Sequence, residues 1–311
     1  MDTKELKNLP TLNSIVNLVG KKNPLHSKNI RNYLQSCSDD FLKLAESYLS
    51  NYVSFLNSRN CDLEFIVNSY LLMVKDILIE QTRFLKTGKY RYDNLDDVYK
   101  NVYSNDEYMS KYMIGVALSQ FLWKNHRDMF IFFKNNIKNF NADKYLEIGP
   151  GHGIYFMESL SSGNFNAYTG IDISETSLEI TKSFINYCVD VNKFKIEFIW
   201  DDITQHKITT RYDYITMGEV LEHVKSPKIL ISSIYLLLNP GGKTYLSTCA
   251  NAPVIDHIYL YNSIDEIKED ILSSGLKIID EIIICNDETE EKDWILKKAN
   301  LSYACIAKRE F

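Results

Sequence analysis

Two carboxylates and two imidazoles are the side chains of this sequence best suited to acid–base chemistry or metal binding. Glu219, Glu222 and His223 form the pattern E-x-x-E-H after a short apolar run, and His257 follows the next apolar run. In an α-helix the first three would share one face. Such a set can hold a divalent ion, Mg²⁺, Mn²⁺ or Fe²⁺, that polarises a hydroxyl. Alternatively, His257 or His223 would act as a general base beside Glu219, because an ordinary imidazole titrates near neutral pH.

A glycine-rich turn comes earlier, in residues 145–154, where an apolar run leads into the start of a predicted helix. Glycines let the backbone turn tightly and approach a ligand, and the N–H groups of a following helix can bind an anion. A dinucleotide site requires G-x-G-x-x-G/A, but Ile154 occupies the position of the third small residue. The spacing is instead E-x-G-x-G-x-G, formed by Glu147, Gly149, Gly151 and Gly153.

That spacing resembles motif I of the class I S-adenosylmethionine (SAM)-dependent methyltransferases. Four further segments resemble later strands of the same family, in the same order. They are Thr169–Ser174, Phe198–Ile203, Tyr212–Val224 and Leu238–Ser247. The resemblance covers roughly residues 140–308 and implies a Rossmann-like, seven-stranded α/β core. Leu276–Cys285 and Leu301–Lys308 would be its last two strands, an antiparallel pair at one edge.

The resemblance also implies how SAM would be bound. Glu147 and the glycine turn would hold the methionine end. Asp172 lies 19 positions after Gly153 and would accept the ribose hydroxyls. Asp202 would lie beside the adenine amino group, with a helix or turn cap as the less favoured alternative. The other expected cofactor contacts are Ile173, Ile203 and Gly218.

The E-x-x-E-H group is similar to the metal ligands of ubiquinone-type O-methyltransferases and of small-RNA 2′-O-methyltransferases. The proposed metal ligands are Glu219, Glu222, His223 and His257. Many relatives also carry E-V-L-E-H-V, in which Glu and His serve as substrate contacts or helix starts. The resemblance therefore leaves metal ligation and direct substrate contact both open.

The 311 residues suggest a catalytic domain and one further unit. We expect a helical domain over residues 1–138 and a SAM-binding domain over 139–311, because apolar spacing of three and four gives way to short apolar runs. Helices are predicted at Asp39–Leu56, Leu63–Phe84 and Asn105–His126. The helical domain would be a lid over the substrate, or a dimerisation arm in a homodimer. Aromatic residues that could wall a substrate pocket, or simply pack helices, are Tyr103, Tyr108, Tyr112, Trp123, His126 and Tyr259.

Charge and composition narrow the classes of molecule that could accept the methyl group. The net charge of −6 and a pI near 5.6 weigh against nucleic acid as a partner, because phosphate contacts need a basic surface. No apolar run is long enough for a membrane span, and the first residues lack a signal-peptide core, so we expect a cytoplasmic protein. The predicted function is methylation of a small molecule by SAM, with O-methylation favoured over N- or C-methylation. The alternatives are an RNA 2′-O-methyltransferase and a catalytically silent SAM-binding scaffold or partner subunit.

Overall fold

The computed structural model describes residues 6–138, 140–205 and 210–310 and divides the chain into two compact units. The first unit is Met1–Asp76 with Asp106–Arg127, and the second is Ile77–Asn105 with Asp128–Phe311. Residues 77–105 and 128–138 therefore group with the sheet, although the sequence pattern placed them with the helical residues 1–138. The role of the helical region as a lid or dimer arm stays a prediction.

The first unit is built from helices. Its elements are α1 (Pro10–Lys22), α2 (Pro24–Gln35), α3 (Asp39–Ser58), the first part of α4 (Leu63–Thr87) and α6 (Asp106–Leu122). Of these, α1 to α4 are amphipathic and α6 is buried on most sides. Helix α3 begins where Ser38 Oγ accepts a hydrogen bond from the Phe41 N–H at 3.3 Å, and acidic Asp39 and Asp40 occupy its first turn. The helices predicted at residues 39–56 and 63–84 are confirmed. The one predicted at 105–126 ends earlier, at Leu122, and α7 (Lys124–Ile137) follows.

The second unit contains a seven-stranded sheet in the order β3-β2-β1-β4-β5-β7-β6 among its described residues. The strands are β1 (Asn141–Ile148), β2 (Asn164–Asp172), β3 (Ile196–Trp200), β4 (Tyr212–Gly218), β5 (Leu238–Ala250), β6 (Leu276–Cys285) and β7 (Leu301–Arg309). Neighbouring strands from β3 to β5 run parallel, and β7 runs antiparallel to both β5 and β6. The expected Rossmann-like core and its antiparallel edge are confirmed.

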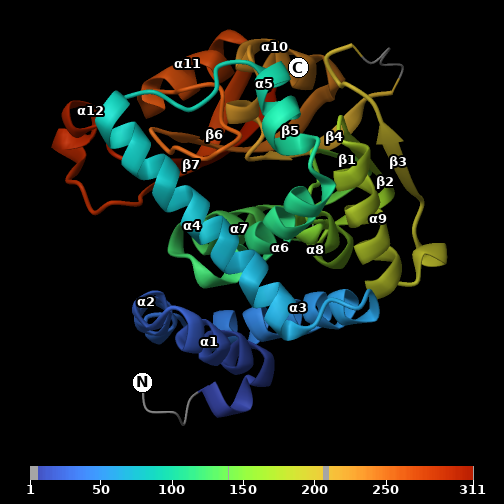
Figure 1. Ribbon diagram of the computed structural model, residues 1–311. Coiled ribbons are helices and arrows are strands. Elements are labelled where there is room, and N and C mark those ends of the chain that lie inside the picture. The colour runs from blue at the N-terminus through green and yellow to red at the C-terminus, as the bar shows by residue number, and fades with distance from the viewer. Residues whose placement is uncertain (1–5, 139, 206–209, 311) are drawn as a thin grey trace. The chain divides into compact units, whose positions relative to one another are not determined.

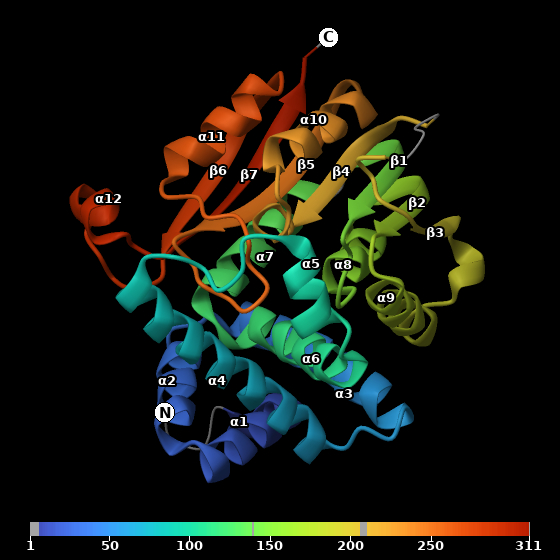
Figure 2. The same cartoon turned by 45° about the horizontal axis from the view of Figure 1, so that its top comes forward.

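Helices cover both faces of this sheet (Figures 1 and 2). On one face lie α10 (Pro227–Leu237) and α11 (Ile264–Ser273), and on the other lie α7, α8 (Ile154–Ser162) and α9 (Glu175–Cys188). The unit also contains the short helices α5 (Leu95–Val98) and α12 (Trp294–Lys297). On the face covered by α10 and α11, the core is aliphatic and includes Ile215, Met217 and Ile234. On the other face it is aromatic: the Phe133 ring of α7 lies 5.1 Å from that of Tyr245. Burial of both faces is what parallel strands require.

The turn after β1 depends on glycine at two points. Gly149 has φ +68° and Gly153 has φ +79°, backbone conformations that L-residues with a side chain rarely adopt. A Cβ on Gly149 would lie 2.8 Å from Val220 Cγ2, and one on Gly153 would lie 3.2 Å from the Phe184 ring. The turn therefore brings its backbone close to the segments after β4 and around α9, and α8 begins directly behind it.

Among the residues that the structure describes, we find no helix with the length and apolar character needed to cross a membrane.

Candidate active site

The E-x-x-E-H residues follow β4 but do not form the α-helix that their spacing suggested. Glu219 has φ +54°, and Leu221–His223 make a single 3-10 turn. The Glu222 carbonyl accepts the backbone N–H groups of Ile258 and Tyr259, at 2.9 and 3.0 Å. A carbonyl used in this way is diverted from the bond to residue i+4 that an α-helix needs. Hydrogen bonds from the loop after β5 thus hold this turn in place of the intrahelical bonds that an α-helix would make.

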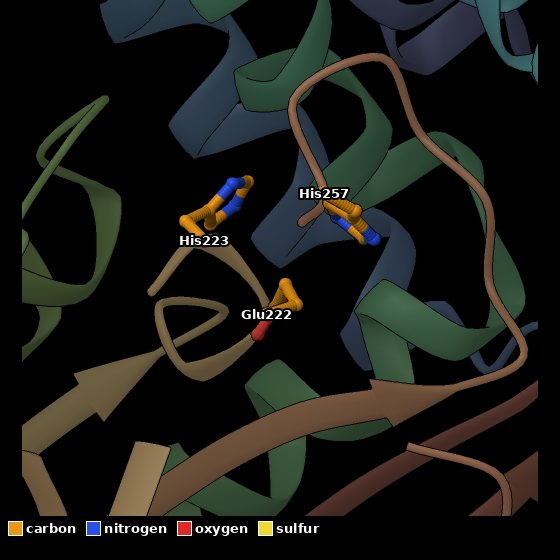
Figure 3. Close-up of side chains that lie close together, drawn as sticks. All are labelled: Glu222, His223 and His257. Carbon is orange, nitrogen blue, oxygen red and sulfur yellow. The ribbon is translucent and has the colours of Figure 1, made fainter. Parts of the chain in front are cut away.

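The same loop carries His257 to the two residues at the end of that turn. Figure 3 shows Glu222 and His223 on the turn after β4 and His257 on the loop that continues from β5. Candidate ligand atoms of these three residues lie within 4.8 Å of one another. The two imidazole rings are 4.9 Å apart and nearly perpendicular, at 85°. Residues that are 34 positions apart in sequence therefore share one site.

Glu219 belongs to a second group that overlaps the first. Its carboxylate lies within 4.8 Å of candidate ligand atoms of Glu222 and Cys249. Glu222 thus belongs to both triads, one with His223 and His257 and the other with Glu219 and Cys249, a residue not among the four proposed. Their catalytic or metal-binding roles stay predictions.

Burial sets the protonation of the two carboxyl groups. Glu222 is fully buried, and Thr248 Oγ1 donates a hydrogen bond to its Oε2 at 2.8 Å. Desolvation raises the pKa of Glu222, and desolvation together with the nearby Glu222 charge raises the pKa of Glu219. Glu219 Oε1 is buried without a hydrogen-bond partner among the described residues. The pair therefore favours a shared proton or a bound positive charge over two unpaired negative charges.

His257 is held as a neutral imidazole. Its Nδ1 lies 2.7 Å from the Ala252 carbonyl oxygen, and since a carbonyl only accepts, Nδ1 carries the proton and Nε2 is bare. Burial, followed by the neighbouring His223, lowers the pKa of His257 to about 3. The expectation that this imidazole titrates near neutral pH was wrong, because the residue is only 6% exposed. His257 is thus suited to act as an acceptor or ligand.

His223 is oriented by Asp256, which the sequence analysis did not single out. The His223 Nδ1 lies 3.1 Å from the Asp256 carbonyl oxygen and 3.5 Å from its Oδ2. The Tyr103 hydroxyl lies 3.3 Å from the same Oδ2 and 3.5 Å from His223 Nδ1. Asp256 Oδ1 is buried and has no hydrogen-bond partner within the described ranges. The one signal in the sequence was its position next to His257.

The expected cofactor acids lie at the ends of β1 and β2. Asp172 accepts the Ser174 N–H at 2.8 Å, and the backbone of Gly151 also hydrogen-bonds to it, which joins this acid to the glycine turn. Desolvation is the larger effect and raises the pKa of Asp172 to about 6. Glu147 is buried and accepts the Tyr145 hydroxyl at 2.7 Å, and burial raises the pKa of Glu147 to about 8.

The residues expected around adenine range from buried to exposed. Asp202 accepts the Thr204 N–H and hydroxyl at 2.9 and 2.7 Å, so its carboxylate caps a turn as the alternative interpretation suggested. Ile203 is buried in the aliphatic core, whereas Ile173 is 61% exposed. Trp200, which is equally exposed and was not singled out from the sequence, donates its Nε1–H to the Ile173 carbonyl at 3.0 Å. Ile173 and Trp200 present apolar surface just beyond Asp172, while Gly218 ends β4.

The proposed substrate-pocket aromatics make packing contacts within their own units. Tyr108 donates its hydroxyl to Asp76 at 2.7 Å and stacks on Tyr112 with 6.0 Å between ring centres. Trp123 donates to the Tyr70 hydroxyl at 2.7 Å. Tyr259, in the second unit, lies edge-on to Tyr261 at 4.8 Å. Their contact with substrate stays a prediction.

A glycine turn after β1, an acid at the end of β2 and an antiparallel β7 inserted between β5 and β6 together define the class I SAM-dependent methyltransferase fold. The sequence model of the methyltransferase domain family matches residues 118–300, more than half of the chain. The chain belongs to this methyltransferase domain family.

Relatives match over part of their length. The mitochondrial ubiquinone biosynthesis O-methyltransferase of Schizosaccharomyces pombe is 31% identical over 109 residues, which cover 35% of this chain and 39% of that protein. The ubiquinone biosynthesis O-methyltransferase of Dechloromonas aromatica is 31% identical over 113 residues, 35% of this chain and 46% of that protein. The matched region thus spans less than half the length of these curated relatives.

Among solved structures, phosphoethanolamine N-methyltransferase 2 of Haemonchus contortus with SAM aligns at a TM-score of 0.53 and 15% identity. The alignment covers 70% of this chain and 60% of that one. At this level of identity the likeness shows the shared fold.

Proposed function

We propose that this protein transfers a methyl group from SAM to a hydroxyl of a small molecule. The observation that carries the proposal is the convergence of Glu222, His223 and His257 within 4.8 Å at the carboxyl ends of β4 and β5. In open α/β sheets, ligands bind in the crevice at the carboxyl ends of the strands. The names of the relatives, which are O-methyltransferases, favour oxygen as the acceptor atom.

The residues after β1 and β2 fit the cofactor. SAM supplies a sulfonium-bound methyl group that an aligned nucleophile displaces in line. The glycine turn leaves room for a ligand against the backbone, because a side chain on Gly149 would collide with Val220. Backbone N–H groups hold the Asp172 carboxylate, which would accept the two ribose hydroxyls of SAM. Exposed Ile173 and Trp200 offer apolar surface for an aromatic base.

On the acceptor side, the chain's own groups would orient the hydroxyl and receive its proton. The bare Nε2 of His257 remains unprotonated at neutral pH and accepts a hydrogen bond from the substrate hydroxyl. The raised pKa of Glu222 brings that carboxyl closer to the range in which a general base works at neutral pH. His223, steadied by Asp256, is the second group that can take the proton.

A metal-assisted form of this reaction is favoured by the same donor set. Glu222, His223 and His257 would hold the divalent ion. Glu219 would lie next to this site, because its carboxylate neighbours that of Glu222. Both histidines donate Nδ1–H to a backbone carbonyl, an arrangement typical of metal-ligating imidazoles. A divalent ion held there supplies positive charge that favours the deprotonated hydroxyl. It would also balance the buried Glu219–Glu222 pair.

We place the acceptor among small molecules because of the net charge of −6, which opposes binding of RNA. The helical region would act as a lid or a dimer arm. A basic groove leading to Glu219 would instead favour the RNA 2′-O-methyltransferase alternative, and intact SAM binding without turnover on any acceptor would favour the scaffold alternative.

Calorimetry with S-adenosylhomocysteine tests the proposal first, with NAD as the control ligand. Micromolar binding of the former alone supports the cofactor assignment, and transfer of labelled methyl to phenols, followed by mass spectrometry, tests the acceptor atom. The titration is repeated after EDTA treatment and with Mg²⁺, Mn²⁺ or Fe²⁺. Saturable metal binding that is lost in His257→Ala supports the metal-assisted form. Lack of S-adenosylhomocysteine binding refutes the proposed enzyme function.

A further inference from the structure

The segment Ile77–Asn105 of the second unit (the inserted segment) contacts the loop that carries His257 at two places, each through a tyrosine hydroxyl. The Tyr90 hydroxyl accepts the Ala252 N–H at 3.1 Å. The Tyr103 hydroxyl donates to Asp256 Oδ2 at 3.3 Å. Ala252 and Asp256 are also the two residues whose backbone carbonyls receive the Nδ1–H groups of the active-site histidines.

The Tyr90 side chain is buried and packed within the second unit. It is 8% exposed, and its ring lies 5.7 Å from the Phe84 ring and 5.7 Å from the His257 ring, the latter at 65°. Next to it, Arg91 forms an ion pair with Glu80, whose side chain is buried. This pair ties the turn after α4 back onto the helix. The Phe84 contact and the Arg91–Glu80 pair therefore hold Tyr90 from outside the loop that its hydroxyl contacts.

Tyr103 is presented differently. It is the last residue of a π-helical turn, Tyr99–Tyr103, which follows α5 directly. Single π turns occur frequently at functional sites, where they redirect a side chain. Val102 beside it is buried at 1%, whereas Tyr99 at the start of the same turn is 63% exposed. The turn thus directs one tyrosine inward and leaves another in solvent.

We propose that Tyr90 and Tyr103 are positioning residues that fix the tautomers of both active-site histidines by holding Ala252 and Asp256 in place. Tyr90 holds Ala252, whose carbonyl keeps the proton of His257 on Nδ1. Tyr103 holds Asp256, whose carbonyl does the same for His223. Nε2 is thereby left as the lone-pair nitrogen of each ring, whether it accepts a proton or binds a metal. This inference rests on the proposed function of the histidines, although the tautomers can be measured without any turnover.

The test compares Tyr90→Phe and Tyr103→Phe with Tyr99→Phe, a matched control on the exposed side of the π turn. Each full-length variant is labelled with ¹⁵N at its histidines, and ring nitrogens are observed by long-range ¹H–¹⁵N correlation. His257→Gln and His223→Gln assign the signals. Protonated and bare ring nitrogens resonate far apart, so the tautomer is read directly.

We expect the wild type and Tyr99→Phe to show both histidines protonated on Nδ1. Tyr90→Phe should give a mixture of tautomers at His257, and Tyr103→Phe should do so at His223. Loss of the outer hydrogen-bond partner of a metal-ligating imidazole typically lowers metal affinity or activity by about 10- to 100-fold, and the two tyrosines hold those partners here. We therefore expect kcat to fall in that range in either variant, with S-adenosylhomocysteine affinity and the far-ultraviolet circular dichroism unchanged.

Unchanged ring-nitrogen signals in both phenylalanine variants would overturn the inference, whatever their turnover. If the tautomers shift as expected but no acceptor is methylated by the wild type, the positioning role stands and the proposed reaction fails. A loss of S-adenosylhomocysteine binding in Tyr103→Phe alone would also contradict the inference, since it would place that residue at the cofactor.

Discussion

Thr248 on β5 donates its hydroxyl to Glu222 Oε2 across 2.8 Å. The bond satisfies one oxygen of a fully buried carboxyl group and joins the turn after β4 to the neighbouring strand. Glu222 Oε1 is left beside Cys249, whose Sγ is 4.0 Å away. The rigid sheet, rather than a mobile loop, therefore decides which oxygen of Glu222 is available for chemistry.

Glu222→Gln keeps the size of the side chain and its bond to Thr248 but removes the charge. We expect kcat to fall by about 100-fold or more, in the range typical of a lost general base, with S-adenosylhomocysteine affinity almost unchanged. Steady-state kinetics and calorimetry measure the two quantities. Glu269→Gln, on the exposed side of α11, is the control. Turnover equal to wild type in both Glu222→Gln and His257→Ala would rule out their part in proton transfer or metal binding.

Asp172→Asn tests the ribose contact. Hydrogen bonds to a charged group contribute about 1.5–3 kcal/mol, so we expect S-adenosylhomocysteine to bind roughly 10- to 100-fold more weakly. The asparagine can still accept the Ser174 N–H, which keeps the turn after β2 in place. Calorimetry measures the affinity, and Asp265→Asn is the control because Asp265 is an exposed acid in the first turn of α11. Equal affinity in the two variants would remove Asp172 from the cofactor site.

Gly149→Ala should damage both stability and cofactor binding. The added Cβ would lie 2.8 Å from Val220 Cγ2, and the backbone at φ +68° disfavours alanine by about 1 kcal/mol or more. Thermal unfolding should shift downward, and S-adenosylhomocysteine affinity should fall at least about tenfold if the collision displaces the turn. The double variant Gly149→Ala/Val220→Ala should recover part of both losses because it removes the collision. Wild-type affinity in the single variant would contradict the assignment of the glycine turn to the cofactor site.

Glu147→Gln should change how stability depends on pH. Burial raises the pKa of Glu147 from 4.5 to about 8, so between these values the folded chain holds a proton that the unfolded chain has released. This group therefore makes the wild type less stable as pH rises from 5 to 8, whereas the amide does not titrate. We expect the Tm difference in favour of Glu147→Gln to grow by on the order of 5 °C across that interval, without cofactor.

Glu197→Gln, which replaces an exposed carboxyl on β3, provides the reference for this pH series. A Tm difference for Glu147→Gln that is flat between pH 5 and 8 would show that Glu147 ionises in the folded chain as it does in the unfolded one.

The sheet was predictable from sequence because its signals are local. The run Leu276–Cys285 coincides with β6, and the strand predicted at 301–308 extends by one residue to Arg309. Glycine spacing fixed the turn after β1 for a similar reason: the backbone at Gly149 and Gly153 adopts a conformation that few other residues tolerate. Local pattern and tertiary structure agree in these segments.

The candidate site was only partly predictable, because its supports are distant in sequence. The E-x-x-E-H spacing suits a helix, but Ile258 and Tyr259 take the Glu222 carbonyl and leave a 3-10 turn. The loss of basicity at His257 arises from burial, which no spacing reveals. Tyr90 lies 162 positions before Ala252, and nothing in the residues around it predicts that contact.

The inserted segment also determines how the chain can be divided. Each compact unit is assembled from two stretches of sequence, since the chain leaves the first unit after Asp76, returns at Asp106 and leaves again after Arg127. A single proteolytic cut therefore cannot release either unit whole. A truncation at residue 138, where helices give way to strands, would retain all seven strands and both histidines but discard Tyr90 and Tyr103. A fragment that keeps the contacts of both tyrosines must therefore begin before residue 90, well ahead of the family match at residues 118–300.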